Sequence, residues 1–143
     1  MADAARAAAR ALDASDLAWL IETDVASWCV YHDAVWTRAA EFRRAGGRTA
    51  FLSNSGPEVM ARVRARWPLE ARFDAVVISC EVGLSKPDPR IYELCLERLA
   101  LPAASALFVD DRADNIEGAA RVGLRTLQFA GPDALERLRA LIG

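Results

Sequence analysis

After residue 48, short apolar runs alternate with amphipathic stretches, and this alternation constrains the fold more than any other feature of the chain. Four runs have the length of strands: Thr49–Leu52, Ala75–Ser79, Ala106–Val109 and Thr126–Phe129. Helices are predicted between and after them, over Pro57–Trp67, Pro89–Leu99, Asn115–Val122 and Asp133–Ile142. Continuous apolar strands alternating with helices are typical of an α/β fold whose mainly parallel sheet is covered on both faces.

The chain before residue 48 is predicted to be helical throughout. The expected helices cover Ala4–Leu12, Leu17–Val30 and Ala34–Ala45, and the pair Gly46 and Gly47 should end the last of them. A length of 143 residues suits one α/β domain. We therefore expect a helical segment over residues 1–33 and an α/β core over residues 34–143.

Composition excludes several classes of protein. The net charge of −2 and a pI near 5.4 argue against nucleic-acid binding. No stretch approaches the ~18 uninterrupted apolar residues of a membrane span. Three scattered cysteines, Cys29, Cys80 and Cys95, suit a reducing compartment, so the protein is expected in the cytoplasm.

Polar residues follow three of the predicted strands, at the edge where α/β sheets place their sites. Asp110, Asp111 and Asp114 are three carboxylates within five residues directly after a strand. Mg²⁺ would offset their repulsion, using one or two carboxylates together with water and phosphate oxygens. Capping of the following helix is the alternative explanation for these acids.

Lys86 is the only lysine in the chain, and prolines at 87 and 89 restrict the loop that carries it. A rigidly presented ammonium is suited to hold a phosphate or a carboxylate. Ser53 and Asn54 follow the first predicted strand and precede a helix with Pro57 near its start, for which Ser55 is the predicted N-cap. They suit either an anion-binding helix start or a simple turn.

Three segments together resemble the haloacid dehalogenase (HAD) superfamily, most of whose members are magnesium-dependent phosphatases. Phe-Leu-Ser-Asn-Ser at residues 51–55 resembles its second motif, and Gly-Leu-Ser-Lys-Pro-Asp-Pro-Arg-Ile-Tyr at 83–92 the third. Phe-Val-Asp-Asp-Arg-Ala-Asp-Asn-Ile at 108–116 resembles the fourth. The resemblance spans about residues 30–130 and implies a three-layer Rossmann-like fold, with the N-terminal helices as part of a helical cap.

The resemblance also implies roles for these residues. Ser53 would hydrogen-bond the transferring phosphoryl group, and Asn54 would shape the same pocket. Lys86 would neutralise the nucleophile and the phosphate. Asp111 would bind Mg²⁺ directly, with Asp110 and Asp114 as ligands or supports. The substrate would be a small phosphorylated metabolite, and the reaction would pass through an aspartyl-phosphate.

The first motif of the superfamily, an Asp-x-Asp after a leading apolar strand, is absent from the sequence. In the family this strand lies between those of the second and fourth motifs, and a vacant slot there would leave unpaired backbone groups that cost about 1–3 kcal/mol each.

Three hypotheses for the whole molecule follow: part of a longer phosphatase, a non-catalytic phosphate-, Mg²⁺- or protein-binding module, or a chain completed by a second chain or by dimer exchange. A metal-independent haloacid dehalogenase is a further alternative, although that branch replaces the acidic pair kept here at Asp110 and Asp111.

Overall fold

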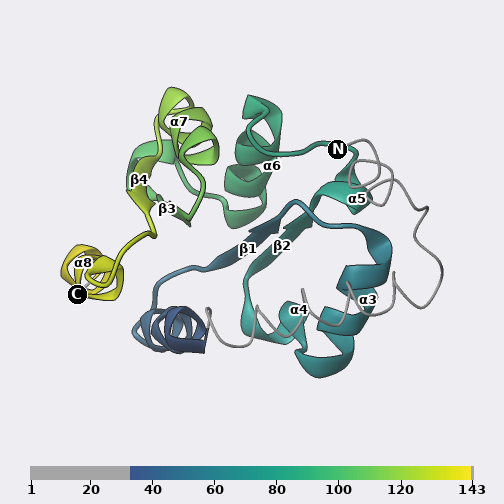
Figure 1. Ribbon diagram of the computed structural model, residues 1–143, viewed down its shortest axis with the longest axis horizontal. Coiled ribbons are helices and arrows are strands. Elements are labelled where there is room, and N and C mark those ends of the chain that lie inside the picture. The colour runs from purple at the N-terminus through teal and green to yellow at the C-terminus, as the bar shows by residue number, and fades with distance from the viewer. Residues whose placement is uncertain (1–32, 143) are drawn as a thin grey trace, which may run out of the picture.

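The computed structural model describes residues 33–142, beginning with a helix over residues 33–44. The predicted helices Ala4–Leu12 and Leu17–Val30 lie outside this range. The predicted division between a helical segment and a core, after residue 33, falls at its border. Strands and helices then alternate as the sequence predicts (Figure 1). The elements are β1 (Ala50–Ser53), α3 (Pro57–Arg66), α4 (Leu69–Arg72), β2 (Ala75–Ile78), α5 (Ser79–Val82), α6 (Pro89–Leu99), η2 (Ala103–Ser105), β3 (Leu107–Asp110), α7 (Ala113–Arg121), β4 (Arg125–Gln128) and α8 (Ala134–Ile142).

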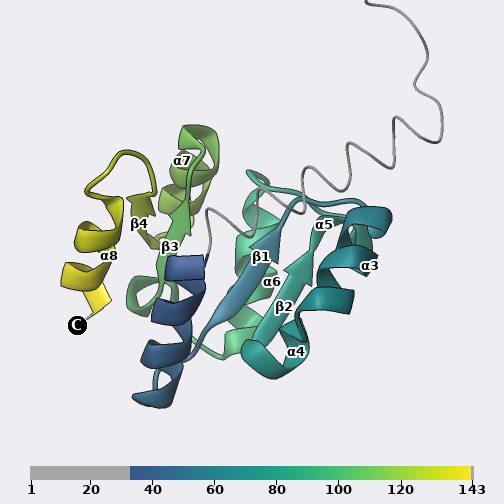
Figure 2. The same ribbon diagram turned by 60° about the horizontal axis from the view of Figure 1, so that its bottom comes forward.

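The strands form two separate parallel pairs within the described residues. β1 pairs with β2 in a register that sets Ala50 opposite Ala75, and β3 pairs with β4, with Leu107 opposite Arg125. β1 and β3 are the strands of the two pairs that face each other, and their arrows point the same way, yet they share no ladder (Figure 2). The expected single parallel sheet is therefore divided in two between β1 and β3.

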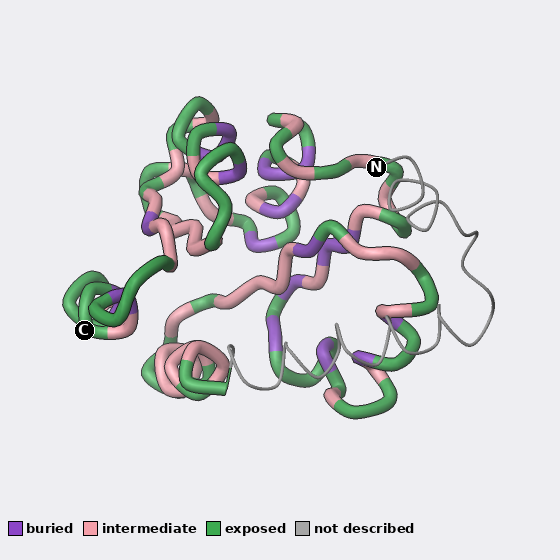
Figure 3. The backbone as a smooth tube through the Cα atoms, in the orientation of Figure 1, coloured by how far each residue is buried: buried purple, intermediate pink, exposed green. Residues whose placement is uncertain are grey.

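Helices cover both faces of these strands. The helix over residues 33–44, α3 and α4 lie on one side, and α6 and α7 lie on the other (Figure 1). Burial is deepest where a helix packs on β2, the strand that carries Val77 and Ile78, both fully buried (Figure 3). On one side Met60, Val63 and Leu69 form a core with Ile78, and on the other Val77 packs with residues of α6.

Local sequence explains most helix boundaries. Asp88 caps α6 by accepting a hydrogen bond from the backbone N–H of Arg90 at 2.9 Å, and α6 covers the predicted residues, Pro89–Leu99. The first described helix ends just before Gly46, whose φ of +97° suits glycine. The predicted N-cap Ser55 is wrong: Gly56 occupies that position, with no side-chain cap.

Two short helices, α4 and α5, were not predicted, because four residues give too little periodicity to recognise. Where a strand boundary differs from its prediction, it differs by one residue, and α7 begins two residues earlier than expected. Within residues 33–142, no helix is long and apolar enough to cross a membrane.

Candidate functional site

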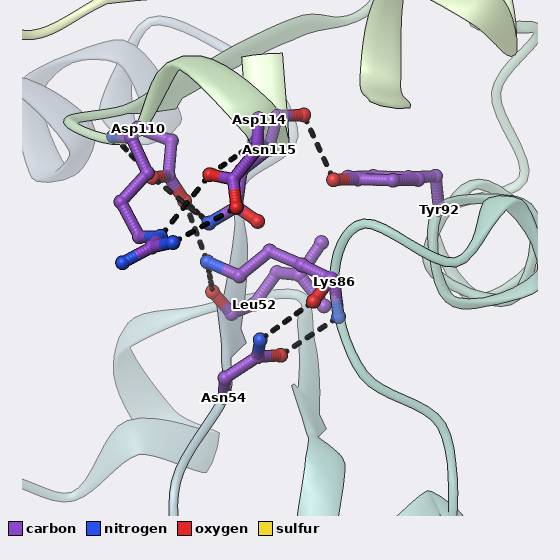
Figure 4. Close-up of polar contacts among 8 residues, drawn as sticks. Leu52, Asn54, Lys86, Tyr92, Asp110, Asp114 and Asn115 are labelled. Carbon is purple, nitrogen blue, oxygen red and sulfur yellow. Dashed lines mark hydrogen bonds and ion pairs between the residues drawn. The ribbon is translucent and has the colours of Figure 1, made fainter. Parts of the chain in front are cut away.

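A buried ion pair joins the carboxyl ends of β1 and β3. Lys86 Nζ lies 2.6 Å from Asp110 Oδ2, and the two side chains are only 9% and 6% exposed. The same ammonium donates to the backbone oxygen of Leu52 at 3.3 Å and lies over the ring of Phe108, 5.6 Å from its centre. Lys86 therefore bridges the two strand pairs at the edge where the sequence predicts a site (Figure 4).

Asp110 is held in place by donors from its own loop and helix. Its Oδ1 accepts from the backbone N–H of Arg112 at 2.9 Å, and Asn115 Nδ2 donates to both carboxylate oxygens at 3.1 and 3.2 Å. Burial alone would raise the pKa of Asp110. The hydrogen bond from Lys86, supported by those from Arg112 and Asn115, outweighs burial and holds the pKa below its ordinary value. Asp110 is thus an ionised, fixed carboxylate.

Asn115 is itself fixed by a contact from α6. It is 3% exposed, and its backbone oxygen accepts a hydrogen bond from the Tyr92 hydroxyl at 2.8 Å. Burial, with a smaller contribution from the nearby charge of Asp110, raises the pKa of Tyr92 to about 12. Tyr92 therefore remains a neutral donor at physiological pH and ties α6 to the start of α7.

The loop carrying Lys86 is fastened from two directions. Asn54 and the Lys86 backbone exchange a pair of hydrogen bonds, Lys86 N–H to Asn54 Oδ1 at 2.8 Å and Asn54 Nδ2 to Lys86 O at 2.9 Å. On the other side α7 approaches Pro87 so closely that a Cβ on Gly118 would lie 2.8 Å from the Pro87 Cβ and carbonyl oxygen. A side chain at this helix position would force Pro87 or α7 to shift.

Ser53 is the last residue of β1 and is 5% exposed. The turn after it is held by Ser79, whose hydroxyl accepts a hydrogen bond from the backbone N–H of Ser55 at 2.9 Å and donates to the Ser55 carbonyl at 3.3 Å. The Ser53 and Asn54 segment is therefore anchored beside Lys86, as the sequence predicts.

The three acids of the predicted metal cluster differ in their surroundings. Asp111 is exposed, and its carbonyl accepts from Gln128 Nε2 at 3.1 Å. Asp114 is paired with Arg112, whose Nη2 lies 2.8 Å from its Oδ2. The hydrogen bonds from the Arg112 guanidinium hold the pKa of Asp114 below its ordinary value.

Across residues 33–142, no three His, Cys, Asp or Glu side chains gather closely enough to hold a metal by themselves. One or two carboxylates at this edge still match the usual needs of Mg²⁺, which completes its shell with water and phosphate oxygens. Asp111, which is exposed and follows Asp110 in the sequence, could supply one such carboxylate.

A groove of about 900 Å³ runs between the two strand pairs, and one end of it collects the predicted residues. Those lining it are Ser53, Asn54, Lys86, Asp110 and Asp111. Asp114 is not among its lining residues.

Sequence reasoning missed Asn115 and Gly118 as parts of the site. A glycine inside an otherwise helical stretch was the available signal for Gly118.

The chain is similar in sequence to several known proteins. The chain is 40% identical over 86 residues to the phosphatase MT3486 of Mycobacterium tuberculosis, covering 59% of this chain and 40% of that protein. It is 34% identical over 99 residues to (S)-2-haloacid dehalogenase 1 of Pseudomonas, covering 69% and 43%. The chain thus spans less than half the length of these two relatives.

The fold is that of solved HAD proteins. The structure of a HAD phosphatase from Thermococcus onnurineus superposes with a TM-score of 0.62 at 25% identity, covering 74% of this chain and 55% of that one. The family model for haloacid dehalogenase-like hydrolases matches residues 2–123. Because that match takes in most of the chain, the protein belongs to the haloacid dehalogenase-like hydrolase family.

Proposed function

We propose that residues 33–142 form the phosphate- and Mg²⁺-binding part of a phosphatase that hydrolyses a small phosphorylated metabolite. The buried Lys86–Asp110 pair beside the exposed Asp111 is the observation that supports this most strongly. It sets a cation and two carboxylates at the carboxyl ends of parallel strands, the usual location of sites in α/β folds.

Lys86 has one donor to spare for a ligand. An ammonium has three N–H groups, and two of them are used by Leu52 O and Asp110 Oδ2. A phosphate oxygen at the mouth of the groove would take the third. The Ser53 hydroxyl and the anchored turn after it would supply further donors to the same phosphoryl group.

When bound, Mg²⁺ would neutralise phosphate charge and orient the phosphoryl group. Asp111 would bind it directly. Asp110 would hold Lys86 in place and would support the metal without binding it directly. Asp114 would act indirectly, by holding Arg112 at the rim.

The nucleophilic aspartate of the proposed reaction lies outside residues 33–142. Asp110 is the aspartate that touches Lys86, and both of its oxygens already accept hydrogen bonds. A carboxylate so engaged is a poor nucleophile. An aspartate from another segment would have to approach the phosphorus of the phosphoryl group that Lys86 holds to form the aspartyl-phosphate.

Calorimetric titration of the chain with inorganic phosphate, with and without Mg²⁺, tests this proposal. We expect phosphate binding that requires Mg²⁺ and weakens at least about tenfold in Asp111→Asn, equivalent to about 1.4 kcal/mol. Glu117→Gln, on the exposed face of α7, is the matched control and should bind as the wild type does. Phosphate binding that depends on neither Mg²⁺ nor Asp111, or no phosphate binding at all, would refute the proposal.

The similarity to a haloacid dehalogenase supports a second candidate function, hydrolysis of 2-haloacids without metal. Chloride release from 2-chloropropionate in excess EDTA would favour that activity.

A further inference from the structure

A second hollow lies between the helix over residues 33–44 and the segment of α4 and Phe73. Its volume is about 560 Å³, within the roughly 300–1,000 Å³ range of small-molecule sites. The C-terminal end of that first helix and α4 both lie toward the end of β1 and β2 that is opposite their arrowheads (Figure 2). Lys86 lies at the carboxyl ends of the strands, so this hollow is separate from the proposed phosphate site.

Three arginines, Arg43, Arg44 and Arg72, line the hollow. Arg43 is engaged, because its Nε lies 3.1 Å from Asp74 Oδ1 and its Nη1 donates to a carbonyl of α4 at 2.7 Å. Arg44 makes only a long contact of 3.4 Å to a carbonyl of its own helix. Among the residues that the structure describes, no carboxylate pairs with Arg44 or Arg72.

The acids on the neighbouring elements already have other partners. Glu41 pairs with an arginine of its own helix, and Glu70 pairs with an arginine of α3 at 2.7 Å. Asp74 accepts a hydrogen bond from Thr49 N–H, and this bond, with the charge of Arg43, holds the pKa of Asp74 below its ordinary value. Asp74 thus neutralises Arg43, and the other two arginines leave two positive charges unbalanced within residues 33–142.

An aromatic wall and small side chains form the rest of the hollow. The Arg72 guanidinium lies over the Trp36 ring, 5.6 Å from its centre. Trp36 is held by edge contacts with Trp67 and Phe73, at centre distances of 5.2 and 5.9 Å. Guanidinium planes stack on aromatic rings, so a second ring can stack on the outer face of the exposed Arg72. Three alanines in the lining leave room for it.

Stabilisation of helix ends is the simpler explanation for these arginines, because cations are favourable in the last turn of a helix. This explanation accounts for Arg43, which donates to a carbonyl of α4. It does not account for Arg72, whose guanidinium lies on the Trp36 ring. A ligand that is both anionic and flat would use the charge and the stacking surface together.

We propose that this hollow binds a mononucleotide, with its phosphate held by the guanidiniums and its base stacked on Arg72. A phosphate monoester carries about −1.5 to −2 charges at pH 7, which matches the two unbalanced arginines. Its oxygens also suit the fork of donors on a guanidinium. A carboxylate has less charge and inorganic phosphate has no ring, so each would use only part of the hollow. Binding here requires neither Lys86 nor Mg²⁺.

Titration of the full chain with adenosine monophosphate (AMP) in EDTA tests this site. EDTA removes Mg²⁺, so the proposed phosphatase activity does not consume the probe. We expect a saturable shift of the Trp36 indole N–H signal in NMR spectra, assigned through Trp36→Phe. AMP should bind at least about fivefold more tightly than adenosine or inorganic phosphate, each of which has one of the two features.

Three variants locate the binding. Arg72→Gln removes a charge and the stacking surface, and should weaken AMP binding at least about tenfold. Ala40→Leu keeps every charge and fills the hollow from an exposed helix position, and should weaken AMP binding as well. Arg121→Gln is the matched control, because Arg121 is an exposed arginine of α7, 3.7 Å from Glu117, and AMP affinity should not change.

Four results would overturn the inference. The first is no shift of the Trp36 signal at millimolar AMP. The second is equal affinity for AMP and inorganic phosphate, which would indicate an unspecific anion site. The third is AMP affinity that is unchanged in both Arg72→Gln and Ala40→Leu. The fourth is AMP binding that appears only with Mg²⁺, which would assign it to the proposed phosphate site.

Discussion

Replacing Gly118 with alanine tests how the fold positions Lys86. The new Cβ would lie 2.8 Å from the Pro87 carbonyl oxygen and Cβ, and these atoms must retreat by about 0.6 Å to reach ordinary contact at 3.4 Å. Pro87 follows Lys86 directly, and the Lys86 backbone is tied to Asn54 by two hydrogen bonds. The displacement should therefore pass to the Lys86–Asp110 contact.

The energies of the Gly118→Ala change oppose each other. Alanine stabilises a helix interior by about 1 kcal/mol over glycine, while overpacking typically costs about 1–3 kcal/mol. We expect the free energy of unfolding to fall by up to about 2 kcal/mol. Weakening one charge-assisted hydrogen bond from Lys86, worth about 1.5–3 kcal/mol, should weaken Mg²⁺-dependent phosphate binding about tenfold.

Urea denaturation and phosphate calorimetry measure these two effects. Glu117→Ala is the matched control, because Glu117 is an exposed neighbour on the same helix, 3.7 Å from Arg121, and an exposed pair contributes little. A Gly118→Ala protein that is about 1 kcal/mol more stable than the wild type, with unchanged phosphate affinity, would refute the close-contact argument.

Three further predictions concern stability. Tyr92→Phe removes the hydroxyl that donates to Asn115 O, and the free energy of unfolding from urea curves should fall by about 1 kcal/mol; no change would show that this bond contributes nothing. The pKa of Asp110 is lowered in the folded state, so its stabilisation is complete above an unfolded pKa near 3.9 and is lost as pH falls through the folded value. The unfolding free energy of the wild type should therefore fall more steeply below about pH 4 than that of Asp110→Asn, and equal slopes would contradict the assignment. Asp74→Ala removes the acceptor for Thr49 N–H, 2.8 Å away where β1 begins, and should cost about 1 kcal/mol by thermal or urea unfolding; a neutral effect would show that water replaces it fully.

Local patterns carried most of the fold prediction. Apolar runs and helical periodicity located all four described strands and the longer helices within one or two residues, because each signal lies within a short window. The α6 start was readable from Asp88 and Pro89, a cap followed by a proline. Ser55 was misassigned because its turn is held by Ser79, which is 24 residues away and gives no local signal.

The site was predictable in part for the same reason. The positions of Ser53, Asn54, Lys86, Asp110 and Asp111 near predicted strand ends indicated that these residues lie near one another. Parallel strands bring their carboxyl ends to one edge of the sheet, and the five residues line one groove. The pairing of Asp114 with Arg112 and the support of Asp110 by Asn115 depend on side-chain geometry at the start of α7, which spacing alone does not fix. The contact of Gly118 with Pro87 joins segments that are distant in sequence and required the three-dimensional structure.

A crystal structure of the chain grown with Mg²⁺ and phosphate would test the central claim most directly. The account predicts phosphate within hydrogen-bonding distance of Lys86 Nζ and the Ser53 hydroxyl, with Mg²⁺ bound through Asp111. Phosphate bound away from Lys86, or Mg²⁺ bound without Asp111, would contradict it.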